Sequence, residues 1–131
     1  MTFDFEKYDT VSNGDAGRWM PVVAPGNHKT DAAVCLYGSD GRVYNQAMLT
    51  VARAKIERMR AAGQTNLDPA DANQDQDELL IACVKDWKGV TLAGAELPCT
   101  PDNVRTMFER FPWFKEQCSK FVHQRTNYLG N

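Results

Sequence analysis

Residues 18–38 have the short apolar runs that are typical of β-strands. Two short apolar runs, 18–23 and 32–38, are rich in β-branched and aromatic residues, and a Pro-Gly-Asn turn at 25–27 separates them. This pattern predicts two strands that pair as a hairpin. Because proline donates no backbone hydrogen bond, Pro21 in the first run is typical of an edge strand.

From about residue 39 the apolar spacing becomes helical. The predicted helix begins with Ser39 or Asp40 as its N-cap and ends at Ala62, with Gly63 as the stop signal. Its apolar stripe consists of Met48, Ala52, Ile56 and Met59, widened by Tyr44 and Val51. The opposite face carries Arg53, Glu57 and Arg60, of which the last two are spaced for a weak surface ion pair.

Three further helices are expected in the second half of the chain. One runs from about Asp75 to Trp87, and residues 89–94 then form a small hairpin or an ordered loop. Thr100 and Pro101 are typical of an N-cap and a first helical position. Pro112 separates this helix from the last one, which carries Trp113, Phe114, Cys118, Phe121 and Val122.

The expected fold class is therefore α+β and helix-dominant, with an N-terminal β-hairpin or small antiparallel sheet followed by about four helices. We expect a single domain over residues 1–131, since this length suits one core that needs no metal or disulfide. Three polar segments are expected outside the regular elements: a lead-in at 1–17, tacked on by its aromatic residues, a mobile loop at 64–77 and a frayed tail at 126–131.

The composition of the chain argues against nucleic-acid and membrane partners. With 15 basic and 17 acidic residues the net charge is -2, so we expect no nucleic-acid partner, although residues 53–60 form a local basic run. No apolar run approaches the roughly 20 residues that span a bilayer. The polar start of the chain, residues 1–7, does not resemble a signal peptide. We therefore expect no membrane partner and a cytoplasmic location.

The residues with catalytic potential have simpler structural interpretations. The four cysteines are widely spaced without a Cys-x-x-Cys pair, which favours reduced, buried thiols. Cys118 and His123 are five residues apart, a spacing that does not align two side chains on a helix. The glycine-containing loop 38–41 lacks the Lys-Ser or Lys-Thr of a phosphate-binding loop, and the acidic segment 68–78 lacks the glycine of an EF-hand. We expect no enzymatic activity, no cofactor and no metal.

Aromatic residues gather near the C-terminal end, between residues 108 and 121. A helical core accounts for most of them, but such an end can also offer a groove to an apolar partner segment. Basic residues interleave with these aromatics, as in a helix pair that faces DNA. Glu109 and Glu116 share the same surface, however, and weaken that interpretation.

Two segments resemble the tail assembly chaperones of long-tailed bacteriophages. Residues 84–89, Val-Lys-Asp-Trp-Lys-Gly, are similar to the Val-x-Asp-Trp-x-Gly helix end of these proteins, and residues 94–103 resemble the Gly-x-x-Leu/Val-Pro loop and the Thr/Ser-x-x-Asn helix start that follow. Residues 34–44 resemble the family's strand, Gly-x-Asp-Ser turn and Tyr-bearing helix start, with Gly41 where the family prefers serine. The resemblance covers residues 34–48 and 80–122.

The resemblance implies a chaperone of virion assembly in the host cytoplasm that is absent from the mature virion. Such proteins coat the long, helical, apolar tape measure protein, keep it soluble and help recruit tail tube protein, in many cases through a longer frameshifted form. It implies reversible burial of apolar helix surface, with self-association and many copies on one client supplying avidity. The candidate partner-binding residues are Tyr44, Met48, Met107, Phe111, Trp113 and Phe114.

Two alternative functions stay open at this point. The first is a permanent tail completion or connector subunit, which would remain in the purified virion. The second is a small DNA-binding regulator, which would bind duplex DNA in a salt-dependent manner.

Overall fold

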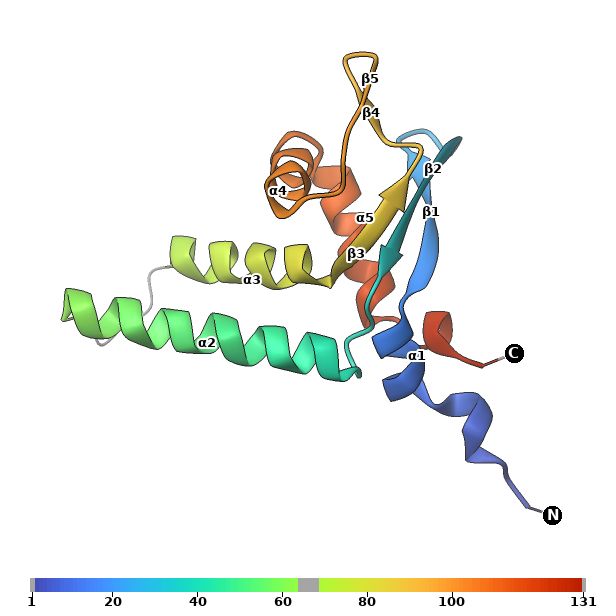
Figure 1. Ribbon diagram of the computed structural model, residues 1–131, viewed down its shortest axis with the longest axis horizontal. Coiled ribbons are helices and arrows are strands. Elements are labelled where there is room, and N and C mark those ends of the chain that lie inside the picture. The colour runs from blue at the N-terminus through green and yellow to red at the C-terminus, as the bar shows by residue number, and fades with distance from the viewer. Residues whose placement is uncertain (1, 64–68, 131) are drawn as a thin grey trace.

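A computed structural model describes residues 2–63 and 69–130 (Figure 1). Within these residues the chain forms a three-stranded antiparallel sheet, a small two-stranded hairpin and five α-helices. The expected α+β, helix-dominant class is confirmed. Figure 1 shows α2 and α3 side by side, extending away from the sheet, while α5 lies against it.

The predicted hairpin is confirmed. Strand β1 (Arg18–Ala24) pairs antiparallel with β2 (His28–Leu36), and Met20 lies opposite Val34. The connecting turn uses positive φ angles at Gly26 and Asn27, which are residue types that tolerate this conformation. The sheet order β1-β2-β3 places the proline-containing β1 at an edge, as predicted.

A third strand, β3 (Val84–Lys88), replaces the end of a predicted helix. It pairs with the other side of β2, so that Val34 lies opposite Trp87. The prediction of a helix reaching Trp87 is wrong beyond Cys83, because β2 offers this segment a hydrogen-bonding edge. Trp87 is only 7% exposed, and its indole N–H donates to the carbonyl of Leu97 at 2.7 Å.

Helix α2 (Arg42–Ala62) begins later than predicted and is capped by a different element. Its N-cap is Gly41, which offers no side chain. Asp15 of helix α1 (Thr10–Ala16) supplies the missing acceptor, and the Val43 N–H donates to its carboxylate at 3.0 Å. The predicted cap Asp40 instead accepts hydrogen bonds from two other residues, as described below. The predicted stop at Gly63 is confirmed by its left-handed φ of 66°.

Helix α3 (Pro69–Cys83) occupies most of the segment predicted to be a polar loop. The loop prediction is wrong from Pro69 onward, and residues 64–68 lie outside the described residues. Three carboxylates of α3 form ion pairs with three different helices: Asp75 with Arg58 at 2.8 Å, Asp77 with Lys115 at 3.2 Å and Glu78 with Arg105 at 3.0 Å. The acidic residues that suggested a solvated loop therefore form the ion pairs that hold α3 to its neighbouring helices.

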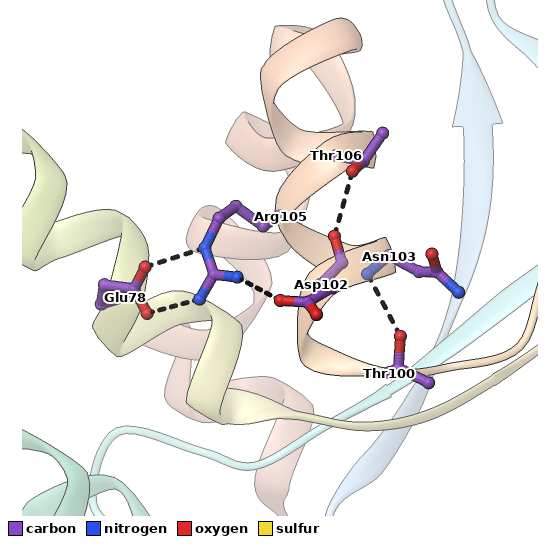
Figure 2. A network of polar contacts seen from close by, with 6 residues as sticks. All are labelled: Glu78, Thr100, Asp102, Asn103, Arg105 and Thr106. Carbon is purple, nitrogen blue, oxygen red and sulfur yellow. Dashed lines mark hydrogen bonds and ion pairs between the residues drawn. The ribbon is translucent and has the colours of Figure 1, made fainter.

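The C-terminal helices begin at the predicted signals. Helix α4 (Pro101–Arg110) has Thr100 as its N-cap, whose hydroxyl accepts from the Asn103 N–H at 3.2 Å (Figure 2). Helix α5 (Pro112–His123) follows immediately, so the break at Pro112 is confirmed. Before them, β4 (Thr91–Leu92) and β5 (Ala95–Glu96) form the small hairpin that was one of two expectations for this segment.

Both end segments differ from expectation. The lead-in 1–17 contains a 3-10 turn, η1 (Phe5–Tyr8), and α1 with Asp9 as its N-cap. Its aromatic residues are largely exposed and contact each other: Phe3 is 62% and Phe5 77% exposed, with ring centroids 4.9 Å apart.

The prediction of a frayed tail at 126–131 is wrong for residues 126–130, and residue 131 lies outside the described residues. A second 3-10 turn, η2 (Arg125–Tyr128), places Tyr128 in the core at 2% exposure. Its hydroxyl donates to the Leu36 carbonyl at 3.1 Å, and its ring lies against Gly38, where an added Cβ would be 3.0 Å away. A tyrosine ring that fills a space beside a glycine is fixed by packing, in spite of its polar sequence neighbours.

The core lies between the sheet and α3, α4 and α5. Its central residues are Val34, Leu36, Val104, Phe108, Phe114, Cys118 and Val122. The four cysteines, all of which the structure describes, are free thiols, and only Cys99 is not fully buried. This confirms the prediction of reduced cysteines that pack as small apolar residues.

Candidate functional site

The Cys118 and His123 side chains lie in different environments. Cys118 is fully buried, and burial raises the pKa of its thiol to about 12. His123 is exposed at the end of α5, with Nδ1 2.9 Å from the Ser119 carbonyl and Nε2 3.2 Å from the Tyr44 hydroxyl. Since a carbonyl only accepts, Nδ1 donates to Ser119, and in the tautomer with its hydrogen on Nδ1 the Nε2 atom accepts a hydrogen bond from the Tyr44 hydroxyl. A protonated thiol in the core and an imidazole at the surface do not form a nucleophile–base pair.

The glycine-containing loop 38–41 is used for structure. Gly38 donates its N–H to the Gly14 carbonyl at 3.0 Å, and an added Cβ on Gly41 would lie 2.7 Å from the Asp15 carboxylate. Asp40 accepts from Arg125 at 2.7 Å and from Thr10 at 2.8 Å, and these two hydrogen bonds, Arg125 first, lower the pKa of its carboxyl group. The loop therefore joins α1, α2 and η2.

Neither a metal site nor a membrane helix is found in the described parts of the chain. Within residues 2–63 and 69–130, no three His, Cys, Asp or Glu side chains gather in a way that suits a metal ion. Over the same residues, no helix combines the length and the apolar character needed to cross a membrane.

The six candidate partner-binding residues are distributed over three helices. Tyr44 and Met48 belong to α2, Met107 to α4, and Trp113 and Phe114 to α5, with Phe111 between the last two helices. Phe114 is 3% exposed and belongs to the core, so it presents no surface to a partner in this structure. Met107, Phe111 and Trp113 are half-buried against the core, whereas Met48 is 44% exposed.

These residues do not form one continuous surface. Tyr44 lines a groove of about 730 Å³ between α2, α3 and α5, together with Lys115 and His123. Trp113 lines a shallower hollow of about 510 Å³ between β1 and α5, together with Met20. The two depressions adjoin at Glu116 of α5, which lines both, and they otherwise use different residues of this helix.

The most exposed apolar surface on a long element belongs to α2. This helix has 21 residues, all described by the structure, and none of them is buried. Leu49 is 50% and Ile56 is 56% exposed. We call Leu49, Ala52, Ile56 and Met59 the α2 stripe. The α2 stripe shares Ala52, Ile56 and Met59 with the sequence-predicted stripe and contains Leu49 in place of Met48. Its residues are exposed except for half-buried Met59.

Basic residues border the α2 stripe along its length. Arg53 lies four positions after Leu49, Lys55 three after Ala52, and Arg60 four after Ile56, the spacings at which helical side chains are neighbours. Arg60 is 75% exposed and lies 3.8 Å from Glu57. Arg58 instead faces α3, where it pairs with Asp75. The α2 stripe is therefore an apolar strip with exposed Arg53 and Arg60 on one side and half-buried Lys55 on the other.

Met48 was predicted from the sequence as a candidate partner-binding residue and Ile56 only as part of the apolar stripe, and neither Leu49 nor the basic border was assigned to a site. The signal was present: Leu49, Ala52, Ile56 and Met59 follow the alternating three-and-four spacing of a helix that packs on another helix. Arg53 and Arg60 had been assigned to the opposite face. Including Leu49 moves the centre of the apolar face toward them.

The segment with the chaperone-like motif contributes to the scaffold. Trp87 and its preceding residues lie in β3, not at a helix end. Gly89 has φ of +68°, and an added Cβ would lie 2.6 Å from the Asp31 carbonyl oxygen. The side-chain amide of Asn103 donates to the Pro98 carbonyl at 2.9 Å, which fixes the chain before α4.

Comparison with known proteins finds no matching family model, no matching curated sequence and no matching solved structure.

Proposed function

We propose that this protein is a phage tail assembly chaperone that binds the tape measure protein, keeps it soluble and helps recruit tail tube subunits. The observation that carries the proposal is α2, a 21-residue helix in which no residue is fully buried and which exposes Leu49 and Ile56. At 1.5 Å per residue it offers a contact about 30 Å long. The identity of the client comes from the resemblance of residues 34–48 and 80–122 to such chaperones.

The exposed area suits a contact that forms and breaks. Leu49 and Ile56 are each about half exposed. Completing their burial is worth about 1 kcal/mol per side chain, so one copy gains only a few kcal/mol before the cost of association. Such a contact is weak for a single copy and becomes strong when many copies occupy one long client. A client coated in this way releases its copies when a more stable assembly takes their place.

Co-expression with the tape measure protein from the same genome tests the proposal. Size-exclusion chromatography of the soluble fraction is expected to show the tape measure protein eluting together with this chain. A matched expression of the tape measure protein alone should leave it aggregated. If it stays aggregated in both cases while this chain elutes by itself, the proposal is wrong.

Mass spectrometry of purified virions provides the second measurement. A chaperone is expected in the infected-cell lysate and absent from the virion. Recovery of this chain in virions at a fixed ratio to the tail tube protein would replace the chaperone with the permanent connector subunit.

A further inference from the structure

We infer that the α2 stripe binds an amphipathic helix whose own apolar stripe is bordered by acidic residues. The inference rests on the proposed function for the source of that helix, but its chemistry comes from α2 alone. The residues that carry it are the four of the α2 stripe and the three basic residues beside them, Arg53, Lys55 and Arg60.

The spacing of the α2 stripe selects a helix as its partner. Leu49 and Ile56 are seven residues apart, as are Ala52 and Met59, so the two pairs occupy the two core positions of a heptad. Side chains in this arrangement insert between those of a facing helix and follow it along its length. The face that packs on α3 is a different one, since Arg58 reaches Asp75 from there.

The basic residues beside the α2 stripe determine which charge the partner helix carries beside its own apolar stripe. In this heptad pattern, Arg53 and Arg60 each directly follow a core residue, Ala52 or Met59. Lys55 directly precedes the core residue Ile56. Charges at these two positions lie across from those of the facing helix and determine partner choice. All three are basic here, so glutamate or aspartate at the corresponding positions of the partner completes the contact.

A second copy of α2 does not meet this requirement. In a parallel pair, Lys55 of one copy would face Arg60 of the other. In an antiparallel pair, the arginines would face one another. Like charges in these positions oppose pairing. Self-association, which the resemblance to tail assembly chaperones implies, would use another surface of the chain.

Two synthetic helical peptides of about four heptads test the inference, both with leucine at the core positions. One carries glutamate and the other lysine at the flanking positions, and the like charges within each peptide keep it from pairing with itself. Binding to the whole protein is measured by fluorescence anisotropy. We expect the glutamate peptide to bind at least about tenfold more tightly at low salt, with a smaller difference at about 0.5 M salt. Equal affinity for the two peptides would overturn the inference.

Substitutions in α2 locate the contact. Charge reversal by Arg53→Glu, Lys55→Glu and Arg60→Glu together is expected to invert the preference, so that the lysine peptide binds more tightly. Ile56→Gln should reduce affinity for the glutamate peptide about tenfold or more. Ala54→Gln, on the exposed opposite side of the same helix, is the matched control and should leave affinity unchanged. Circular dichroism of each variant confirms that the helix is retained. A preference that survives charge reversal contradicts the inference.

The same variants separate this inference from the proposed function. If the tape measure protein remains soluble with the charge-reversed variant, the chaperone function stands and the assignment to the α2 stripe is wrong. If the peptides behave as expected but the tape measure protein is never solubilised, the α2 stripe binds an acidic helix and the proposed client is wrong.

Discussion

Helix α2 and the C-terminal region formed by α5 and η2 have similar amphipathic sequences but different surroundings. In α2 no residue is fully buried, and Ile56 is 56% exposed. In α5 and η2, Phe114, Cys118 and Tyr128 are all at most 3% exposed. Both segments carry apolar residues at helical spacing. The comparison shows that such a pattern predicts a face to be covered, whereas the fold decides whether this chain or a partner covers it.

The largest loss of stability from a single substitution is expected in the C-terminal region formed by α5 and η2. Tyr128→Ala should lower the free energy of unfolding by about 3–5 kcal/mol, because it leaves a cavity beside Gly38 and removes the hydrogen bond to the Leu36 carbonyl. Tyr128→Phe keeps the ring and should cost only about 1 kcal/mol. Denaturant unfolding measures both. Equal losses for the two variants would show that the ring does not fill the core.

The next largest loss of stability is expected from a glycine substitution beside the sheet, which a second glycine substitution controls. Gly89→Ala is expected to cost about 2–3 kcal/mol, because it adds a clash with the Asp31 carbonyl to the strain of a positive φ. Gly94 also has a positive φ but has no atom within 4 Å of an added Cβ. Gly94→Ala should therefore cost only about 1 kcal/mol. Thermal unfolding distinguishes them, and a larger loss at Gly94 would contradict the register of β3.

The ion pair that holds η2 to the loop before α2 has a smaller, pH-dependent effect. At neutral pH, Asp40→Asn should lower stability by about 1 kcal/mol, since Arg125 and Thr10 lose a charged acceptor. The pKa of Asp40 is lowered in the folded protein, so this contribution is present above the unfolded value of 3.8 and is lost as the pH falls through the folded value. Unfolding at neutral pH and near pH 3 should show the two proteins converging. A constant difference would mean that the charge of Asp40 is irrelevant.

The smallest effect is expected on the exposed side of the comparison. Leu49→Gln and Ile56→Gln should each change the free energy of unfolding by less than about 0.5 kcal/mol, because neither side chain packs in the core. Chemical denaturation of both variants provides the measurement. A loss of 2 kcal/mol or more, of the order seen for core positions, would show that the α2 stripe is covered within this protein.

Signals within a few residues of each element predicted much of the fold. The turn at 25–27, the cap at Thr100 and the breaks at Gly63 and Pro112 are local, and the structure confirms each of them. Their physical causes, a positive φ, a side-chain acceptor or a missing N–H, lie in the residues themselves.

Features that depend on distant partners were not predictable in the same way. Residues 84–88 form a strand because β2 lies beside them, and Asp15 caps α2 from a different helix. Asp77 lies where the predicted loop and the predicted helix overlapped, and its ion-pair partner, Lys115, is too far along the chain to be identified from the sequence. The candidate site shares this limit: the apolar spacing of α2 is visible in the sequence, but its exposure depends on where α3 packs.

The docking of η2 also sets an order on folding. Tyr128 completes the core with a hydrogen bond to a carbonyl 92 residues earlier, and its own carbonyl accepts from the Asn13 side chain, 115 residues earlier. Contacts of such separation form late, since the entropy of closing a long loop must be overcome first. During synthesis, the core therefore stays incomplete until residue 128 has left the ribosome.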